Sequence, residues 1–489
     1  MSSAPTLVWL RRDLRLADNP ALTAALARRR PLVLLWLLDE TSPGLRPLGG
    51  ASRWWLHHSL AAFAADVARL GGRLILRRGP ASVVVPGVAA ECGADAVFWN
   101  GRHGTDEIAI DDDLTAHLHA DGLAVESFRA DLLHDPRELR TGTGGPYRVF
   151  TPFWRACLAH VAPAAPLPAP TALPTGPALP SEALDAFGLH PRAPDWSGGL
   201  AATWTPGEAG AAARLAIFLE KGIYSYSTER DRPDLDLTSH LSPHLRFGEI
   251  STAQVLAALD RRTPPPAAID RDKFVAEIGW REFSHHLKFH FPDLASRNLQ
   301  ARFDAFPWVR DDALLVAWRR GRTGYPIVDA GMRQLWATGT MHNRVRMVAA
   351  SFLVKHCRID WREGEAWFWD TLVDACPAAN PASWQWVAGS GADAAPFFRI
   401  FNPVTQGTKF DPDGAYVRRW VPELARLPAP AIHSPWTLPP ARLAAAGVVL
   451  DRDYPKPVVD HAPARERALA AFAATAAEPP PERAPRRID

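Results

Sequence analysis

Tryptophans gather in the C-terminal half of a chain that holds 19 of them. Leu or Phe would fill a core equally well without an indole N–H to satisfy, so packing alone does not account for this density. Indole is readily oxidised by one electron, so a row of such rings can conduct an electron hole when an oxidant is bound beside it. The rings concerned are Trp308, Trp336, Trp361, Trp367, Trp369, Trp384 and Trp386.

Two predicted helices place charged or amide groups beside large flexible or aromatic side chains. Glu277, Trp280 and Arg281 share one helix face, where a flat indole beside hydrogen-bonding groups suits a base-like ligand. Asn343 and Met347 are four residues apart, away from the apolar face of their own helix, and can address one ligand together. Half-buried or solvated helix faces are the alternative in both cases.

Arg344 and Arg346 lie close to the apolar face of the second of these helices. A guanidinium buried without a partner is costly, so we expect a carboxylate partner. Asp374 is the candidate because it lies in an otherwise apolar stretch. Solvated arginines on a surface helix are the alternative.

The segment 238–248 combines hydroxyl groups with a helix start. We expect Ser242 to be the N-cap and Pro243 the first helical residue. Such a start presents free N–H groups to an anion. An ordinary capped helix is the alternative.

The first 130 residues alternate between strand and helix patterns. Short apolar runs at 7–10, 32–37, 74–76 and 96–99 are typical of strands buried on both faces of a parallel sheet. Apolar residues at 56, 60, 63, 67 and 70 predict an amphipathic helix between two of them. The pattern predicts a doubly wound α/β domain over residues 1–130, without the glycine fingerprint of dinucleotide-binding sheets.

Prolines crowd residues 161–180 and predict an extended linker over residues 131–200. Helical periods dominate afterwards, for example at 341, 345, 348 and 352, and Pro326 is suited to a first helical turn. We therefore expect a large all-α domain over residues 201–475, and a disordered tail over 476–489.

Composition excludes several classes of protein. A chain of 489 residues with net charge +2, 47% hydrophobic and 22% charged residues is neither a small binding module nor disordered. Its four cysteines show no paired spacing, so no disulfide framework or metal site is expected. No leader or membrane-spanning run is evident, which favours a cytoplasmic protein, and we expect a monomer.

Six motifs resemble the DNA photolyase/cryptochrome family between residue 7 and about residue 470. They are LVWLRRDLRL at 7–16 with Asp18 and Asn19, TSHLSPHL at 238–245, WREF at 280–283, GYPIVDA at 324–330, MHNR at 341–344 and WQWVAGSGADAAPFFRIFNP at 384–403. The resemblance implies the photolyase fold: an α/β antenna domain, a linker, and an all-α domain that binds FAD.

The resemblance also implies which residues hold the flavin. Arg281 would lie near the pyrophosphate, Arg346 and Asp374 would pair against the isoalloxazine, and Asn380 would face its N5 atom. Trp384, Trp361 and Trp308 would form the electron-transfer triad from flavin to surface. The full cofactor set is Tyr226, Thr238, Ser239, His240, Leu241, Ser242, Phe274, Arg281, Arg346, Asp374, Ala375, Cys376 and Asn380. Cys376 stands where the family usually has an acid.

The implied substrate is UV-damaged DNA carrying a cyclobutane pyrimidine dimer. The lesion and DNA contacts would be Arg230, Glu277, Trp280, Asn343, Arg344, Met347, Trp386 and Gln406. Glu277 and Asn380 would act in catalysis with the tryptophan triad. Excited reduced FAD would donate an electron to the flipped-out dimer and recover it after the ring splits, and a damaged pair is readily flipped.

An antenna chromophore is also implied, with Asp106 and Glu107 at its site. Glu107 matches the pattern for methenyltetrahydrofolate, whereas Ala295 and Ser296 stand where folate binders often have Cys-Lys. Folate, another chromophore and no chromophore all stay open.

Other functions compete with dimer repair. A cryptochrome-like photoreceptor would keep the flavin and the tryptophans but signal through a partner. A (6-4) photolyase would carry a His-containing motif, from which MHNR at 341–344 differs. An unrelated α/β nucleotide-binding enzyme with a helical appendage is a weaker alternative.

Overall fold

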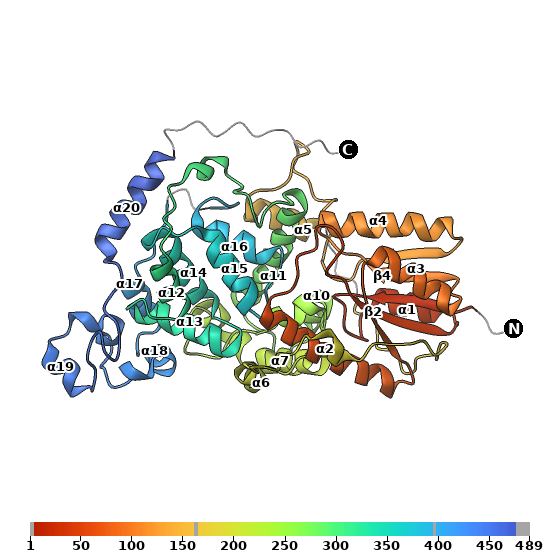
Figure 1. The fold of residues 1–489 in the computed structure, drawn as a ribbon, viewed down its shortest axis with the longest axis horizontal. Helices are drawn as coiled ribbons and strands as arrows, with labels where there is room; N and C mark the ends of the chain where they lie inside the picture. The colour runs from red at the N-terminus through yellow and green to blue at the C-terminus, as the bar shows by residue number, and fades with distance from the viewer. Residues whose placement is uncertain (1–3, 161–164, 395–397, 476–489) are drawn as a thin grey trace. The chain divides into compact units, whose positions relative to one another are not determined.

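The computed structural model describes residues 4–160, 165–394 and 398–475. The chain forms two compact units, and each is assembled from separate segments of sequence (Figure 1). The first unit comprises residues 1–227, 237–292 and 373–376, and the second comprises 228–236, 293–372 and 377–489. The domain boundaries expected at 130, 200 and 475 stay predictions, and the tail expected over 476–489 lies outside the described residues.

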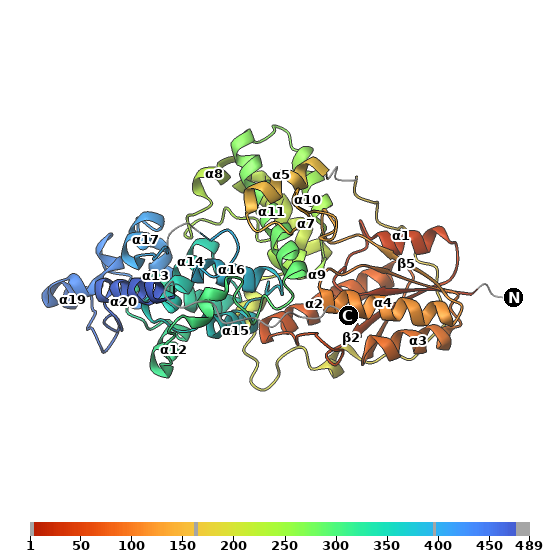
Figure 2. The ribbon, with the colours of Figure 1, turned by 90° about the horizontal axis from the view of Figure 1, so that it is seen from above.

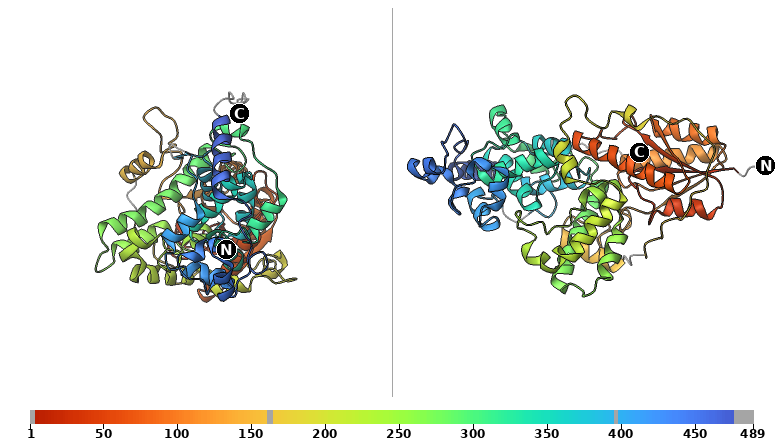
Figure 3. Two further views of the ribbon diagram at one scale, coloured as in Figure 1. Left: turned by 90° about the vertical axis from the view of Figure 1, so that its left-hand side faces the viewer. Right: turned by 90° about the horizontal axis from the view of Figure 1, so that it is seen from below.

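A five-stranded parallel sheet forms the centre of the first unit, in the order β3-β2-β1-β4-β5. The four predicted strands are confirmed, and a fifth, unpredicted strand follows at one edge. Figure 3 (right) shows the strands side by side with helices flanking them. The strands are β1 (Thr6–Leu10), β2 (Leu32–Leu38), β3 (Leu74–Arg78), β4 (Ala96–Asn100) and β5 (Ala124–Phe128).

Helices cover both faces of this sheet, because successive strand residues point to opposite faces and nearly all of them are apolar. Val8 and Leu10 of β1 pack with helices α1 and α2, whereas Leu7 and Trp9 pack with α3 and α4. Figure 2 shows α3 and α4 side by side. The doubly wound architecture is confirmed. These helices are α1 (Pro20–Ala27), α2 (Gly50–Arg69), α3 (Ala81–Cys92) and α4 (Thr105–Ala120).

The rest of the first unit is helical. Between residues 165 and 183 there is no helix, and one isolated bridge joins Thr175 to Leu32, as the prolines predict. The predicted linker nevertheless carries α5 and α6. The elements are α5 (Phe150–His160), α6 (Gly198–Thr203), α7 (Glu208–Glu220), α9 (Ser242–Phe247), α10 (Thr252–Asp260) and α11 (Ala268–His290), with short 3₁₀ turns at Leu184–Phe187 and Gly222–Ser225. Helix α8 (Tyr226–Glu229) lies where the chain passes into the second unit.

The described part of the second unit is built from helices, which confirms the predicted helical C-terminal half. Helix α14 continues into one π-helical turn at Phe352–His356. The helices of this unit are α12 (Asp312–Arg319), α13 (Pro326–Thr338), α14 (Asn343–Ser351), α15 (Trp361–Thr371), α16 (Ala379–Ala388), α17 (Pro403–Phe410), α18 (Ala415–Trp420), α19 (Pro440–Ala445) and α20 (His461–Ala474), with 3₁₀ turns at Ala301–Ala305, Pro422–Leu424, Ala431–His433 and Pro435–Thr437.

The motif at 324–330 is structural. Asp329 is fully buried and accepts hydrogen bonds from the Thr323 amide and hydroxyl at 2.7 Å and from the Tyr454 hydroxyl at 2.5 Å. Gly324 has φ +82°, and a side chain there would collide with the backbone of Lys456. The motif therefore fixes the start of α13.

Across the described residues, no helix combines the length and the apolar character that a bilayer crossing requires.

Candidate functional site

Charged side chains fill the carboxyl edge of the sheet, where the strand order reverses between β1 and β4 and parallel sheets commonly bind ligands. Arg11 Nη1 lies 2.6 Å from Asp111 Oδ1, and Arg102 Nη2 lies 2.7 Å from the same oxygen. Arg11 also donates to the Asn100 carbonyl. The cavity left among residues of this edge measures about 10 Å³. The charged side chains at this edge therefore form ion pairs and hydrogen bonds with one another.

The two predicted antenna acids point in different directions from the start of α4. Glu107 Oε2 accepts from Arg12 Nη2 at 3.0 Å and from the Gly104 amide at 3.1 Å. Burial favours the neutral acid, but Arg12 and then Arg102 outweigh it and lower the pKa of Glu107 to about 2. Asp106 is exposed and lies against Gly44. Glu107 thus belongs to an internal ion pair, and the antenna role of both acids stays a prediction.

Arg281 of α11 pairs with Asp131, a residue that the sequence did not single out. Its Nη2 hydrogen-bonds the Asp131 carboxylate, and its Nη1 donates to the Asp131 carbonyl at 3.0 Å. Burial favours the neutral acid, but Arg281 and then His285 outweigh it, so the pKa of Asp131 lies far below its ordinary value. The pair connects α11 to the chain that follows β5.

Arginines gather beside this pair. Arg246 Nε donates to the Ala375 carbonyl at 2.8 Å, and burial followed by the positive charge of Arg12 lowers the pKa of Arg246 to about 10. Cys376 acts electrostatically on Arg12, Arg246 and Arg281. Arg12 pairs with Glu107 and Arg281 pairs with Asp131, whereas the charge of Arg246 is disfavoured by burial and by Arg12. A phosphate or pyrophosphate group beside Arg246 would offset that cost.

The predicted phosphate-binding segment meets Asp374 in the first unit. The Ser242 hydroxyl donates to Asp374 Oδ2 at 2.7 Å, and α9 begins at Ser242 with Leu241 in the cap position and no side-chain cap bond. The prediction of Ser242 as N-cap and Pro243 as first helical residue is therefore wrong by one position: the helix already begins at Ser242, whose hydroxyl is directed at Asp374 and accepts no bond from a backbone amide of the first turn. The Leu241 amide donates to Ser239 Oγ at 3.4 Å, and His240 has φ +53°. Thr238 precedes them in the same segment.

Tyr226 and Phe274 are core residues of the first unit. Their rings meet edge to face at 5.5 Å, and both are about 5% exposed or less. Arg346 belongs to the second unit, where its Nε donates to the Met341 carbonyl at 2.7 Å. Its predicted pairing with Asp374 stays a prediction.

Asn380 of α16 is held by a carboxylate on α15. Its Nδ2 donates to Glu365 Oε1 at 2.8 Å and to the Glu365 carbonyl at 3.1 Å. Asn380 is 8% exposed and Glu365 3%. Both donor hydrogens are thus used, and Oδ1 is the part of the amide left to accept a hydrogen bond.

The three predicted triad tryptophans lie in the second unit, two of them buried and one partly exposed. Trp384 is 2% exposed and packs on α15 at Gly364, where a Cβ atom would come within 2.1 Å of its ring. Trp361, one turn away on α15, is fully buried and donates to Asn298 Oδ1 at 2.9 Å. Trp308 is partly exposed, which is compatible with its predicted place at the surface end. The order of the triad stays a prediction.

Arg344 lines a groove of about 510 Å³ in the second unit. Its Nη2 lies 2.5 Å from Asp231 Oδ2, and its guanidinium stands over the Phe410 ring at 4.4 Å. The carboxylate partner of Arg344 is thus Asp231, and the expectation of Asp374 is wrong for this arginine because a nearer acid pairs with it. The groove is lined by Thr228, Asp231, Arg232, Arg344, Arg399, Phe401, Gln406, Lys409 and Phe410.

The remaining predicted lesion residues divide between the units. Glu277 and Trp280 are partly exposed on α11 in the first unit. The second unit carries Asn343 and Met347 on α14, and Arg230 Nε lies 3.9 Å from Asp231 Oδ1 there. Their assembly around one lesion stays a prediction.

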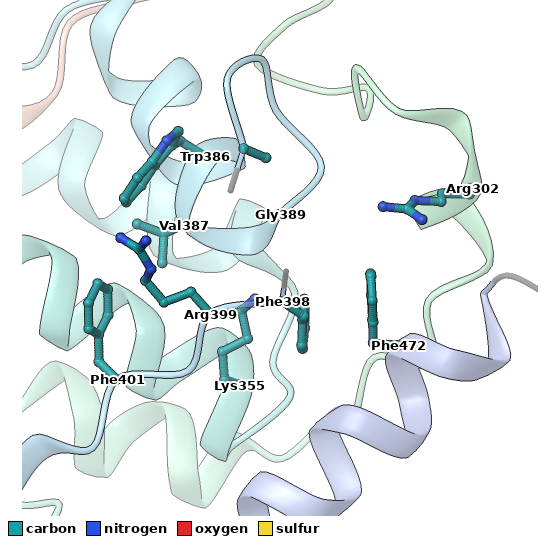
Figure 4. Close-up of a pocket in the computed structure, with 10 residues that line it drawn as sticks. Arg302, Lys355, Trp386, Val387, Gly389, Phe398, Arg399, Phe401 and Phe472 are labelled. Carbon is teal, nitrogen blue, oxygen red and sulfur yellow. The ribbon is translucent and has the colours of Figure 1, made fainter. Parts of the chain in front are cut away.

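Trp386 lines a small cavity of about 40 Å³ (Figure 4). Figure 4 shows Lys355 beside the Phe398 ring, and Arg302 near Phe472. Lys355 is 1% exposed and donates to the Ala388 carbonyl at 3.1 Å, and burial holds its pKa well below the ordinary value. This cavity shares Arg399 and Phe401 with the groove of Arg344.

A parallel sheet with buried arginines at its edge and a helical unit rich in tryptophan are compatible with the photolyase class, and comparison with known proteins shows that class. Residues 6–172 match the model of DNA photolyase, and residues 274–474 match the FAD binding domain of DNA photolyase. The chain belongs to the DNA photolyase/cryptochrome family and has its FAD-binding domain.

Individual relatives extend over nearly the whole chain. It is 52% identical to a deoxyribodipyrimidine photo-lyase of Agrobacterium fabrum, covering 97% of this chain and 98% of that protein. It is 40% identical to Cryptochrome-1 of Arabidopsis thaliana, covering 95% of this chain and 70% of that protein. The crystal structure of a bacterial class III photolyase from Agrobacterium tumefaciens superposes with a TM-score of 0.95 at 52% identity, over 98% of this chain and 99% of that one. A Synechocystis cryptochrome superposes with a TM-score of 0.85 at 29% identity, over 96% of this chain and all of that one.

Proposed function

We propose that this enzyme repairs cyclobutane pyrimidine dimers in DNA in a light-driven reaction. The groove around Arg344 carries the proposal, because it combines several cations with aromatic rings in one hollow of about 510 Å³. Cations contact phosphates and rings stack on bases, so this combination suits a DNA strand. The similarity to a deoxyribodipyrimidine photo-lyase at 52% identity supports the same substrate.

The side chains of the groove would position the DNA backbone. Arg232, Arg344, Arg399 and Lys409 offer charge to phosphates, and Phe410 offers a ring face. With a net charge of only +2, the chain must rely on such a local surface for binding. Trp280 and Trp386 would pack on the flipped-out dimer, and the Glu277 carboxyl group would hydrogen-bond it.

FAD held here would, in its reduced and light-excited form, supply an electron for repair of the lesion. The buried guanidinium of Arg246, whose charge is disfavoured by burial and by Arg12, suits the pyrophosphate of this cofactor, and Ser242 and Asp374 offer further polar contacts. Asn380 would accept a hydrogen bond from the flavin edge through Oδ1, because Glu365 occupies its Nδ2. Trp384, Trp361 and Trp308 would carry the electron hole outward.

Light-dependent repair of an oligonucleotide with one thymine dimer tests the proposal, with a (6-4) lesion and a dark reaction in parallel. We expect the protein to repair the thymine dimer but not the (6-4) lesion, and to do so only in light. Protein that carries FAD but repairs neither lesion would contradict the proposal and favour a photoreceptor, and repair of the (6-4) lesion alone would place the chain in the other repair class. An antenna chromophore, a monomeric state and a cytoplasmic location stay predictions.

A further inference from the structure

Trp280 is held in a ladder of three aromatic rings within the first unit. Its ring lies face to face with Phe150, with centroids 3.8 Å apart and planes 8° apart. Phe150 in turn lies nearly parallel to Trp154, at 6.3 Å and 12°. Phe150 and Trp154 belong to α5, which lies beside α11, the helix that carries Trp280 (Figure 2).

Helix α11 has a glycine at the position where the Trp154 ring packs against its backbone. A Cβ atom at Gly279 would come within 2.6 Å of the Trp154 ring, so only glycine allows that ring to rest on the helix. One turn further along, the Ser284 hydroxyl donates to the Trp280 carbonyl at 2.8 Å. The Trp154 ring therefore packs on α11 at Gly279, the residue before Trp280, and it also lies beside Phe150.

Phe150 blocks one face of the Trp280 ring, and Phe283 meets the ring edge to face at 6.0 Å. Phe150 covers one side of the indole at stacking distance, while Trp280 as a whole stays partly exposed. A base that stacks on Trp280 must approach from the side opposite Phe150. A ring already fixed in one orientation loses little conformational entropy when a ligand binds.

We propose that Phe150 is a positioning residue for lesion recognition, which fixes the Trp280 ring in the orientation that stacks on a flipped-out pyrimidine dimer. This inference rests on the proposed function. It predicts that Phe150 contributes to the preference for damaged DNA and contributes nothing to the contacts with phosphates, which lie elsewhere in the chain.

The test compares binding of dimer-containing and undamaged duplexes by the FAD-loaded protein at several salt concentrations. Phe150→Leu keeps an apolar side chain of similar size but removes the flat ring, and we expect the preference for the dimer to fall about twofold to tenfold. Affinity for undamaged duplex and its salt dependence should not change. Phe150→Tyr keeps the ring and should retain the preference.

Two further variants separate positioning from general damage to the fold. Phe128→Leu alters another half-buried phenylalanine of the first unit, which meets Phe98 edge to face at 5.7 Å, and should leave the preference intact. In a Trp280→Ala background, Phe150→Leu should have no additional effect. If Phe150→Leu folds poorly, Trp154→Leu removes the outer ring of the ladder and should lower the preference in the same sense.

The outcomes distinguish this inference from the proposed function. A parent protein with no preference for the dimer would overturn the proposed function. A parent with the preference, combined with an unchanged preference in Phe150→Leu and Trp154→Leu, would overturn the role of Phe150 alone. If Phe128→Leu lost the preference for the dimer to the same extent, or if Phe150→Tyr lost it too, Phe150 would act only by packing.

Discussion

Asn380 and Glu365 form a buried amide–carboxylate contact between neighbouring helices, with Nδ2 2.8 Å from Oε1. The second hydrogen bond, from the same nitrogen to the Glu365 carbonyl at 3.1 Å, fixes the amide in one of its two orientations. A residue on α15 therefore determines which atom of Asn380 is free.

Asn380→Asp places two carboxylates in this contact, so one of them must take up a proton. We expect the variant to lose about 3 kcal/mol of stability at pH 8 and less at pH 5.5, because its raised folded pKa favours the folded state only while the pair holds a proton. Urea unfolding at both pH values measures this. Glu365→Gln combined with Asn380→Asp should remove the penalty, and an equal loss at both pH values would contradict the explanation.

Arg344→Ala should weaken binding of damaged and undamaged duplexes alike and reduce the slope of log affinity against log salt by about one. The matched variant is Asp231→Asn, which removes the acid 2.5 Å from Arg344 and releases the guanidinium toward DNA. We expect it to tighten both duplexes. Titration by fluorescence anisotropy measures both effects, and a selective loss for the damaged duplex in Arg344→Ala would show that this arginine contacts the lesion.

Trp308→Phe should slow lasting photoreduction of protein loaded with oxidised FAD, because phenylalanine is much harder to oxidise than the partly exposed indole it replaces. Dimer repair by chemically reduced protein should persist. Absorbance during illumination with an external reductant measures the first rate. Trp196→Phe, at a 45% exposed site in the first unit, is the control and should behave as the parent. Equal photoreduction in both variants would refute the triad assignment.

Cys376→Asp should add a carboxylate to the cluster of Arg12, Arg246 and Arg281. We expect a higher thermal unfolding midpoint for the FAD-free protein at pH 7, since the new carboxylate would stabilise the charge of Arg246, which burial and Arg12 disfavour. Cys376→Ser, which is polar but uncharged, should leave the midpoint near that of the parent. A midpoint lowered by Cys376→Asp would show that the cluster already contains enough negative charge.

We expect His356 to contribute to a fall in stability in mild acid, together with other histidines whose pKa burial lowers, such as His286 and His290. Burial and then His461 lower its pKa to about 3, and its Nε2 lies 2.8 Å from His461 Nδ1. In the unfolded chain the His356 imidazole binds a proton as pH falls through about 6.5, whereas in the folded chain it stays neutral at that pH. The associated stability is therefore present above pH 6.5 and is lost as pH falls toward 3, at about 1.4 kcal/mol per pH unit.

Urea unfolding at pH 7, 6 and 5 checks the effect of His356. His356→Gln should make the free energy of unfolding fall less steeply between pH 7 and pH 5. His119→Gln, at an exposed site on α4, should leave the slope as in the parent. Parallel declines in the parent and in His356→Gln would exclude His356 as the cause.

Periodicity predicted the inner strands because their residues are apolar on both faces. β1 is buried at all five positions, whereas β5, at the edge of the sheet, is partly or fully exposed throughout and includes Glu126. An edge strand with one solvated side lacks the continuous apolar run that marks its neighbours. For the same reason the helix at 341–352 was predicted well, since its buried face repeats with the helical period.

Site residues were harder to predict where their partners are distant in sequence. Asp131 lies 150 positions from Arg281, and Glu365 lies in a helix different from that of Asn380. No spacing rule connects such residues, so only the folded chain reveals them. The family resemblance supplied the positions of Arg281 and Asn380, but not the carboxylates that orient them.

Val373 is fully buried in the core that packs on the sheet, although it follows the entire segment 293–372 of the second unit. While the chain is being synthesised, the first unit therefore has a missing piece until residue 373 has left the ribosome. Helices α12 to α15 of the second unit are synthesised during that wait, so the nascent chain carries an incomplete apolar core in the meantime. A gene fragment that ends at residue 292 would encode this incomplete core permanently.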